Sequence, residues 1–346
     1  MAETQYLGDI PLYPRSTYVA ELRGELPPET SQPASSRLLL SPLYIALTAG
    51  LIVLIASGVV PWPLLPVVSI VLGLLFACHT FVAHEMLHGG IVKNKTIQRI
   101  TGWIAFLPFL HSPRLWVAWH NSTHHGGTQM PHDPDAFATL DEYNKQKPTQ
   151  IAIDYFAMGG RRWRGVLTLL VGFTGQSMHQ LVSARSRGYL SRGEHLLAWS
   201  ETLLGVCVWT LIGILVGPVA FVFVFVIPHI VANVGVMAFI VTNHSLSPRV
   251  AINDPLISGL SVTTTKFIDW ITLDFGLHVE HHLFPAMSSR HLGVVRDLCI
   301  KHWPDRYKSM TLGHALGELH RTARVYKTPT TLFDPRTGQE FPTLFG

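Results

Sequence analysis

The sequence has few charged residues and few cysteines. Asp, Glu, Lys and Arg together make up 14% of its 346 residues, whereas apolar residues make up 48%. An average soluble domain has about 25% charged residues, so this composition argues against an ordinary soluble globule, and the apolar content argues against disorder. The three cysteines, Cys78, Cys207 and Cys299, are widely spaced and odd in number, which excludes a disulfide scaffold or a cysteine-based zinc module.

Long apolar segments are abundant instead, and they fall into two pairs. The segments are 38–60, 64–83, 196–216 and 219–242. Each is long enough to cross a hydrocarbon layer of about 30 Å at a rise of about 1.5 Å per residue. Pro-Trp-Pro at 61–63 and Gly217-Pro218 separate the members of each pair. We therefore expect an all-α membrane protein with four transmembrane helices in two hairpins, within a membrane domain covering 38–305.

The flanking segments are more polar. Residues 1–37 contain no basic stretch followed by an apolar core, so the sequence predicts a loosely ordered tail and no signal peptide. Residues 306–346 are predicted to form a C-terminal segment. Two shorter apolar stretches, 104–110 and 166–173, are too brief to span and are expected to be interfacial or buried helices.

Basic residues predict the orientation in the membrane. No Lys or Arg occurs between Arg37 and Lys93, or between Arg192 and Arg249. By the positive-inside rule, both termini and the middle segment of this multi-pass membrane protein are expected on the cytoplasmic side. The net charge is +4 and the basic residues form no dense run, so no binding to nucleic acid is predicted.

Histidine is unusually frequent in this sequence, with 19 copies. Eight of them form three clusters, and a ninth candidate ends the fourth apolar segment. The first cluster is His84 and His88, the second is His120, His124 and His125, the third is His278, His281 and His282, and the ninth histidine is His244. Residues four apart share one face of a helix, so each cluster can point at a common centre. Imidazole suits iron, zinc, copper and nickel, and eight ligands are too many for one ion. The sequence therefore predicts a dinuclear metal site in a cytoplasmic helical cap.

These clusters read H-x₃-H, H-x₃-H-H and H-x₂-H-H, and Leu283-Phe284-Pro285 follows the third. Three such boxes, placed before and after the second pair of spans in this way, resemble the integral-membrane fatty acid desaturase and hydroxylase superfamily over about residues 38–305. The resemblance is closest to the acyl-lipid desaturases and the related carotenoid hydroxylases. The first box differs from the H-x₄-H of stearoyl-CoA-type enzymes, and the third box lacks the Gln of the front-end type with fused cytochrome b5.

The resemblance implies that the nine histidines ligate two Fe²⁺ ions. It also implies O₂-dependent desaturation of a lipid acyl chain, with electrons from a separate carrier of the ferredoxin or cytochrome b5 type. Hydroxylation of a lipid or carotenoid uses the same ligands, and the sequence leaves that alternative open.

Two other functions, a zinc metalloprotease and a metal transporter, would also use histidines or a membrane location. The first box is also an H-E-x-x-H motif, in which Glu85 of a membrane zinc metalloprotease would act as general base. That function leaves two boxes unexplained. A metal transporter would need polar residues along its spans, whereas here the polar groups gather at the helix ends.

Four polar residues are candidates to support the metal ligands by hydrogen bonding. They are Asn243, Asp274, Glu280 and Asn121. Asp274 precedes His278 by four residues and could hold the outer N–H of that imidazole, as carboxylates commonly do beside metal ligands. An ordinary solvated role is the alternative for each. The basic group of Arg161, Arg162 and Arg164 could contact either lipid headgroups or an acidic redox partner.

Overall fold

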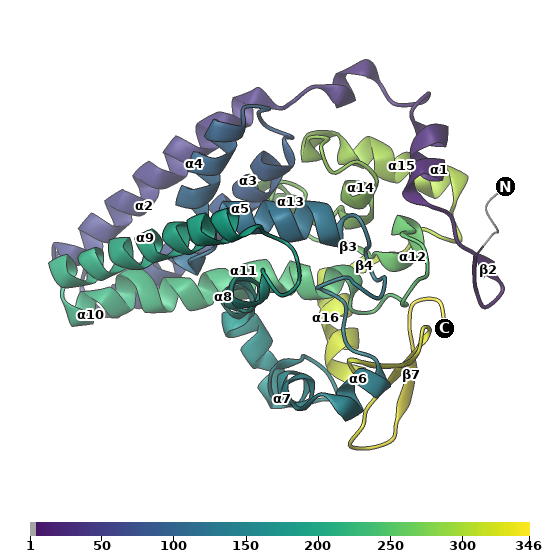
Figure 1. Ribbon diagram of the computed structural model, residues 1–346. Helices are drawn as coiled ribbons and strands as arrows, with labels where there is room; N and C mark the ends of the chain where they lie inside the picture. Colours follow the sequence, from purple (N-terminus) through teal and green to yellow (C-terminus); the bar gives the residue numbers. More distant parts are fainter. Residues whose placement is uncertain (1–4) are drawn as a thin grey trace. The chain divides into compact units, whose positions relative to one another are not determined.

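The computed structural model describes residues 5–346, and most of the described chain is helical (Figure 1). The chain divides into two units, which are described separately. Unit 1 comprises Met1–Gln32, His120–Thr168 and Ala238–Gly346, and unit 2 comprises Pro33–Trp119 and Leu169–Met237.

Unit 2 holds most of the apolar helices. Its elements are η2 (Ser35–Leu39), α2 (Leu40–Ala56), η3 (Trp62–Leu64), α3 (Leu65–His88), α4 (Lys95–Phe106), η4 (Leu107–Phe109), α5 (Pro113–Trp116), α9 (Arg192–Val216), α10 (Pro218–Phe221) and η7 (Val222–Val226). Three further elements run from one unit into the other: η5 (Val117–His124), α8 (Val166–Ser183) and α11 (Ile227–His244). Within unit 2, α2 packs along α3, and α9 contacts α10 (Figure 1).

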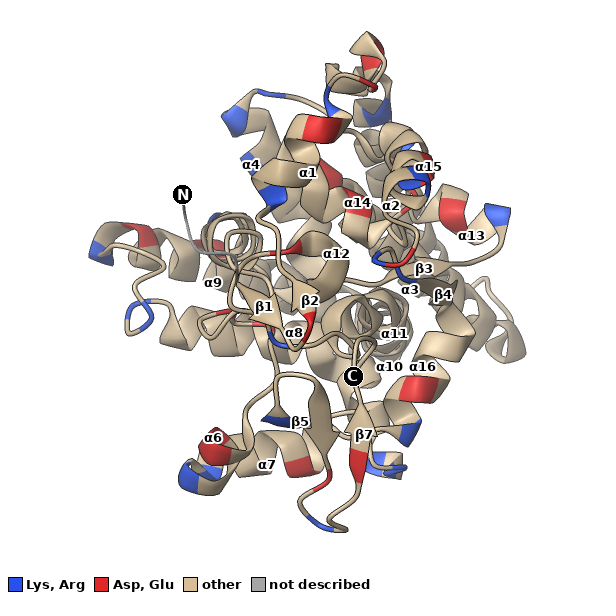
Figure 2. Cartoon of the chain, turned by 90° about the vertical axis from the view of Figure 1, so that its right-hand side faces the viewer, with Lys and Arg blue, Asp and Glu red and all other residues tan. Residues whose placement is uncertain are grey.

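Within residues 5–346, four helical segments are long and apolar enough to cross a membrane: Ser35–Ala56, Trp62–His88, Arg192–Val216 and Pro218–His244. They correspond to the four predicted spans with shifted ends. The first helix ends at Ala56 because Gly58 follows with a positive φ of 72°. The second continues to His88, so the first histidine box is the last turn of a long helix. In Figure 2 the ribbons of α2 and α10 carry no charged residue, whereas α6, α7, α13 and α16 of unit 1 do.

The short apolar stretch 104–110 is helical, as expected, and it docks on α9 within unit 2. The indole of Trp209 donates a hydrogen bond to the carbonyl of Leu107 (2.8 Å), and Trp103 donates to the carbonyl of Glu201 (2.8 Å). The Glu201 carboxylate accepts from Ser112 at 2.5 Å. The one acid predicted within the third span therefore has an internal partner, as a polar group in an apolar helix requires.

Unit 1 contains shorter helices and small sheets. Its helical elements are α1 (Arg15–Leu22), η1 (Pro28–Ser31), α6 (Leu140–Lys145), α7 (Lys147–Phe156), η6 (Trp163–Gly165), α12 (Pro255–Ser258), α13 (Lys266–Ile271), α14 (His278–Leu283), η8 (Ser289–His291), α15 (Leu292–His302) and α16 (Leu312–Arg321). Its strands are β1 (Tyr6–Leu7), β2 (Ile10–Pro11), β3 (Ser261–Thr263), β4 (Ser309–Thr311), β5 (Val325–Thr328), β6 (Thr331–Phe333) and β7 (Glu340–Pro342). β1 pairs with β2, β3 runs parallel to β4, and β5, β6 and β7 form an antiparallel sheet. The all-α prediction did not include these sheets.

The described part of the N-terminal segment is folded rather than loose. Residues 1–4 of the predicted tail lie outside the described residues. Tyr18 and Leu22 lie four apart on α1, and both are fully buried in a core with Val279 and Leu283 of α14. The Tyr18 hydroxyl also donates to the buried carboxylate of Asp254 (2.9 Å). The polar composition of residues 1–37 hid this pair because two apolar residues on one helix face are enough to bury a short helix.

Candidate metal centre

Four histidines of unit 1 converge on one point. His124 ends η5, His244 ends α11, and His278 and His282 lie four apart on α14. One ring nitrogen of each lies within 4.8 Å of the corresponding nitrogens of the other three, and all four side chains are buried. We call these four residues the four-histidine cluster. The i,i+4 spacing on α14 places two ligands on one face, as the sequence predicts.

Three of the four rings are held through Nδ1. His124 Nδ1 lies 2.8 Å from Oδ1 of Asp133, and His244 Nδ1 lies 2.8 Å from the carbonyl oxygen of Ser258. A carboxylate and a carbonyl oxygen only accept, so each Nδ1 carries a proton, and Nε2 is the atom that offers a lone pair when the ring is neutral. His282 Nδ1 lies 3.1 Å from the hydroxyl of Thr128, which itself donates to the carbonyl of His124. Metal-ligating histidines are typically oriented by such outer hydrogen bonds.

The Nε2 atoms face one another at the centre of the cluster. His244 Nε2 lies 2.7 Å from His278 Nε2 and 3.2 Å from His282 Nε2. Lone pairs at this separation repel unless a proton or a cation lies between them. The donor set of neutral imidazoles suits borderline transition metals such as iron or zinc, rather than magnesium or calcium. These residues therefore fit a transition-metal ion.

Charges around the cluster are set by two carboxylates. Burial alone would lower the pKa of His124, but the neighbouring Asp133 and Asp135 outweigh it and raise that pKa to about 9. Burial alone would likewise raise the pKa of Asp133, yet its hydrogen-bonded contact with His124 lowers it. For His282, burial and then the surrounding histidines lower the pKa well below its usual value. Asp133 is therefore an ionised partner that holds one ligand.

Sequence analysis missed Asp133. The signal was present as Asp133-Pro134-Asp135, nine residues after His124. Nine residues correspond to no helical repeat, and the chain turns back only through the loop between η5 and α6. A motif search that looks for i,i+3 and i,i+4 pairs does not find such a partner.

The remaining histidines of the second and third boxes lie beside the four-histidine cluster in unit 1. The ring of His125 stacks on His282 with centroids 4.1 Å apart, and its Nε2 lies 3.3 Å from Nε2 of His120. The ring centroid of His281 lies 4.8 Å from that of His125. All six predicted box histidines of unit 1, together with His244, thus gather in one region.

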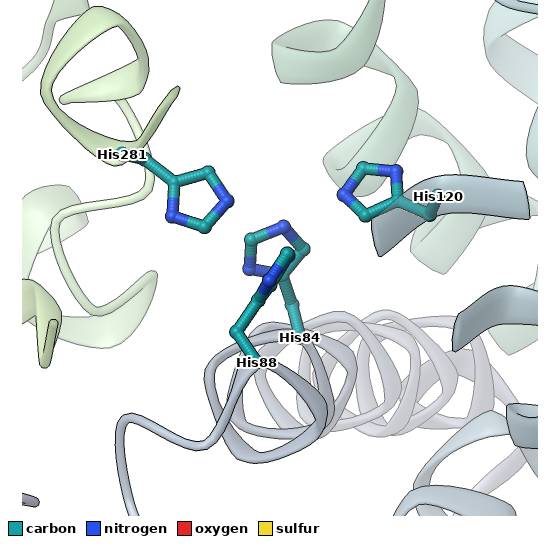
Figure 3. Close-up of side chains that lie close together, drawn as sticks. All are labelled: His84, His88, His120 and His281. Atoms are coloured by element: carbon teal, nitrogen blue, oxygen red, sulfur yellow. The ribbon is translucent and has the colours of Figure 1, made fainter. Parts of the chain in front are cut away.

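The first box belongs to unit 2. His84 and His88 leave the same side of α3, with ring centroids 4.7 Å apart (Figure 3). The edge of Trp116 packs against both rings, at 5.3 and 5.2 Å. The helix ends directly afterwards because Gly89 adopts a left-handed conformation with φ of 85°. Figure 3 also draws His120 and His281, which belong to unit 1.

Glu85, the acid of the H-E-x-x-H motif, has a partner in unit 2. Its carboxylate lies 2.5 Å from the guanidinium of Arg37, and both side chains are largely buried. The first box therefore places its acid in an ion pair with the segment that begins the first apolar helix.

The four predicted supporting residues differ in their surroundings. Glu280 is fully buried and accepts hydrogen bonds from Ser261 (2.6 Å) and Tyr307 (2.5 Å), and burial raises its pKa. Asn243 is buried, and its backbone carbonyl accepts from Leu260. The remaining two are Asp274, whose backbone has a positive φ of 55°, and the half-buried Asn121. Their support of the ligands stays a prediction.

Helices apolar enough to cross a membrane, together with histidine clusters that could hold a metal ion, are features typical of a membrane metalloprotein. The family model for fatty acid desaturases matches residues 61–313, so the chain belongs to the fatty acid desaturase family.

Three similar proteins carry related names. The chain is 22% identical to "Omega-6 fatty acid desaturase, chloroplastic" of Arabidopsis thaliana over 84% of this chain and 65% of that protein. It is 21% identical to the protein of the same name from Spinacia oleracea, over 70% of this chain and 55% of that protein. It is 24% identical to "sn-1 oleoyl-lipid 12-desaturase" of Arthrospira platensis, over 66% of each. The chain thus spans between 55% and 66% of the lengths of these relatives.

Proposed function

We propose that this protein desaturates a lipid acyl chain in an O₂-dependent reaction at a histidine-ligated di-iron centre. The observation that carries the proposal is the four-histidine cluster, in which three rings are held through Nδ1 and the Nε2 atoms face a common centre. Membership of the fatty acid desaturase family and the names of the relatives support iron and an acyl-lipid substrate.

We assign the first iron to the four-histidine cluster. The second is assigned to the remaining box histidines, which are His84, His88, His120, His125 and His281. This second assignment rests on the order and spacing of the three boxes along the chain and on the resemblance to the family. When bound, the two irons would supply the redox chemistry that reduces O₂ and removes hydrogen from the lipid acyl chain.

The residues of this chain orient the ligands and keep water away. Asp133 holds the proton at Nδ1 of His124, and the carbonyl of Ser258 holds the proton at Nδ1 of His244. Each imidazole is thereby fixed in the tautomer that presents Nε2. The cluster is buried throughout, which favours a dry site in which a reactive oxidant is not lost to side reactions.

The membrane arrangement follows from the basic residues. We propose four transmembrane helices in two hairpins, with both termini and the iron site on the cytoplasmic side, because Lys and Arg are absent from the two long apolar regions. Electrons are proposed to come from a separate carrier of the ferredoxin or cytochrome b5 type. Exposed basic residues such as Arg161 and Arg164 suit an acidic carrier or anionic headgroups.

The two alternatives differ in what the structure offers them. Hydroxylation of a lipid or carotenoid would use the same histidines, and the identity of the product separates it from desaturation. Zinc-dependent proteolysis needs Glu85 as a general base, but the ion pair with Arg37 holds that carboxylate at 2.5 Å. Because the ion pair occupies that carboxylate, the protease is disfavoured.

Lipid profiling of a host that expresses the chain tests the proposal. The wild type is expected to add a double bond to membrane acyl chains, and His282→Ala is expected to abolish it. His314→Ala is the matched control, because His314 is a largely exposed histidine on α16. A hydroxyl group in place of the double bond would favour the hydroxylase. Unchanged lipids in all three strains, with iron bound and a reductant supplied, would contradict the proposal.

A further inference from the structure

The loop that follows His244 is held by the C-terminal segment of unit 1. Four backbone groups of residues 245–249 bond to residues 324–344. The pairs are Arg324 to the carbonyl of Ser245, Leu344 N to the carbonyl of Leu246 (2.9 Å), the Tyr326 hydroxyl to the carbonyl of Ser247 (2.6 Å), and Arg249 N to the carbonyl of Pro329 (2.9 Å). The family match ends at residue 313, so all four C-terminal partners lie beyond the matched region.

Gln129 connects this C-terminal segment, residues 324–344, to the second histidine box. Its side-chain Nε2 donates to the carbonyl of His244 (2.5 Å) and lies 3.2 Å from the hydroxyl oxygen of Tyr326. Its backbone N donates to Oδ2 of Asp133 (2.7 Å), whose other oxygen holds His124. One residue thus contacts the backbone of one proposed ligand, the carboxylate that orients another, and the tyrosine of β5.

The backbone conformation of Gln129 indicates that the surrounding contacts hold this residue firmly in place. Its φ is 60°, in the left-handed region that side chains other than glycine rarely adopt, and its side chain is buried. Such a conformation is strained for a residue with a side chain and persists where the surroundings hold it. The Tyr326 side chain is also buried, so the hydrogen bond that the Gln129 amide donates to its hydroxyl oxygen is shielded from water.

We propose that Tyr326 and Gln129 are positioning residues for the four-histidine cluster. Through the Tyr326 hydroxyl and the Gln129 side-chain amide, the C-terminal segment sets the position of His244. Through the backbone N–H of Gln129 and the carboxylate of Asp133, the same residue also supports His124. As far as the metal is concerned, this inference rests on the proposed function.

Two variants test it in the full-length protein. Tyr326→Phe removes only the hydroxyl, and Gln129→Met keeps the side-chain length and the backbone strain but removes the amide. Both variants are expected to remain folded by circular dichroism. Hydrogen exchange of residues 244–250 is expected to be faster in both metal-free variants. Iron release to a chelator is expected to be at least about tenfold faster, the lower limit for loss of a group that supports metal ligands.

Tyr18→Phe is the matched control, because its hydroxyl is equally buried in unit 1 but bonds to Asp254. It is expected to lower thermal stability without faster iron release. If the wild type retains iron and the two test variants release it at the wild-type rate, the positioning role is wrong and the proposed function stands. If hydrogen exchange at residues 244–250 is unchanged in both test variants, that result alone would contradict the proposal that the C-terminal segment holds this loop. A wild type that binds no iron would contradict the proposed function, and the metal-positioning role with it.

Discussion

His124 and Asp133 are nine residues apart in the chain, yet Nδ1 of the histidine lies 2.8 Å from Oδ1 of the aspartate, and both side chains are buried. The pair sits at one end of a chain of hydrogen bonds through Gln129 to the backbone of His244. One carboxylate therefore connects two of the proposed iron ligands, and its removal has consequences for both.

Asp133→Asn is expected to weaken metal binding by about 10- to 100-fold, because the neutral amide is a poorer acceptor for Nδ1 of His124 and can also present its NH₂ group to the ring. Iron content per chain after dialysis measures the effect, with acyl-chain desaturation as a second readout. Asp141→Asn is the control, since that carboxylate is largely exposed on α6. Full iron occupancy and activity in Asp133→Asn would contradict the role assigned to this residue.

Metal binding is expected to release a proton and to strengthen with pH. The pKa of His124 in the metal-free site is raised to about 9 by Asp133 and Asp135 against the effect of burial. A metal ligand must be neutral, so below that pKa the apparent affinity should rise about tenfold per pH unit. The same raised pKa stabilises the metal-free fold fully below the ordinary value of about 6.5, and this contribution is lost as the pH rises through about 9.

Chelator competition with Co²⁺ between pH 7 and 9, corrected for protonation of the chelator, measures that slope. Asp133→Asn should make this dependence on pH shallower, because His124 then loses the carboxylate that most stabilises its protonated form. An affinity for Co²⁺ that is independent of pH in the wild type would contradict the prediction.

Glu85→Gln separates the oxidative function from proteolysis. The substitution removes the charge from the pair with Arg37, so we expect a loss of about 1–3 kcal/mol in stability, visible as a lower melting temperature in detergent. Iron content and the lipid product should persist, because this residue is not among the proposed ligands. Glu85→Ala is a second variant that removes the acceptor altogether and should destabilise more. Loss of a peptidase activity in Glu85→Gln, with no lipid product in any variant, would favour the zinc enzyme.

Leu22→Ala tests whether the N-terminal segment is part of the core of unit 1. Leu22 is fully buried against α14 and α15, so its truncation should cost about 2–5 kcal/mol. Limited trypsin digestion should then cleave faster at the adjacent Arg23. Ile300→Ala on α15 is the control, because that side chain is about half exposed and its truncation should cost little. Equal digestion rates in the two variants would show that the segment contributes no packing.

The sequence predicted the apolar helices and the local geometry of the histidine boxes well. Uninterrupted apolar runs have one stable structure in a bilayer, and a spacing of four residues places both side chains on one face. This is why His84 and His88 pair on α3 and why His278 and His282 pair on α14. His244 lies at the end of α11 within the four-histidine cluster, and its role as a ligand stays a prediction.

The parts that escaped prediction depend on contacts between distant segments. Asp133 reaches His124 through an irregular loop, and Tyr326 reaches Ser247 across about eighty residues of chain, so no periodicity announces either contact. The short strands β5, β6 and β7 carry too few residues to show an alternating pattern. The burial of Tyr18 and Leu22 was obscured by the polar composition around them.

The hydrogen bonds from residues 324–344 to the loop after His244 also set an order of events during synthesis. The histidine boxes leave the ribosome first, and the groups that brace the loop after His244 appear only when residues 324–344 have been added. A nascent chain therefore carries its imidazoles before it carries these supporting groups, and we expect metal loading to follow synthesis of the C-terminal strands.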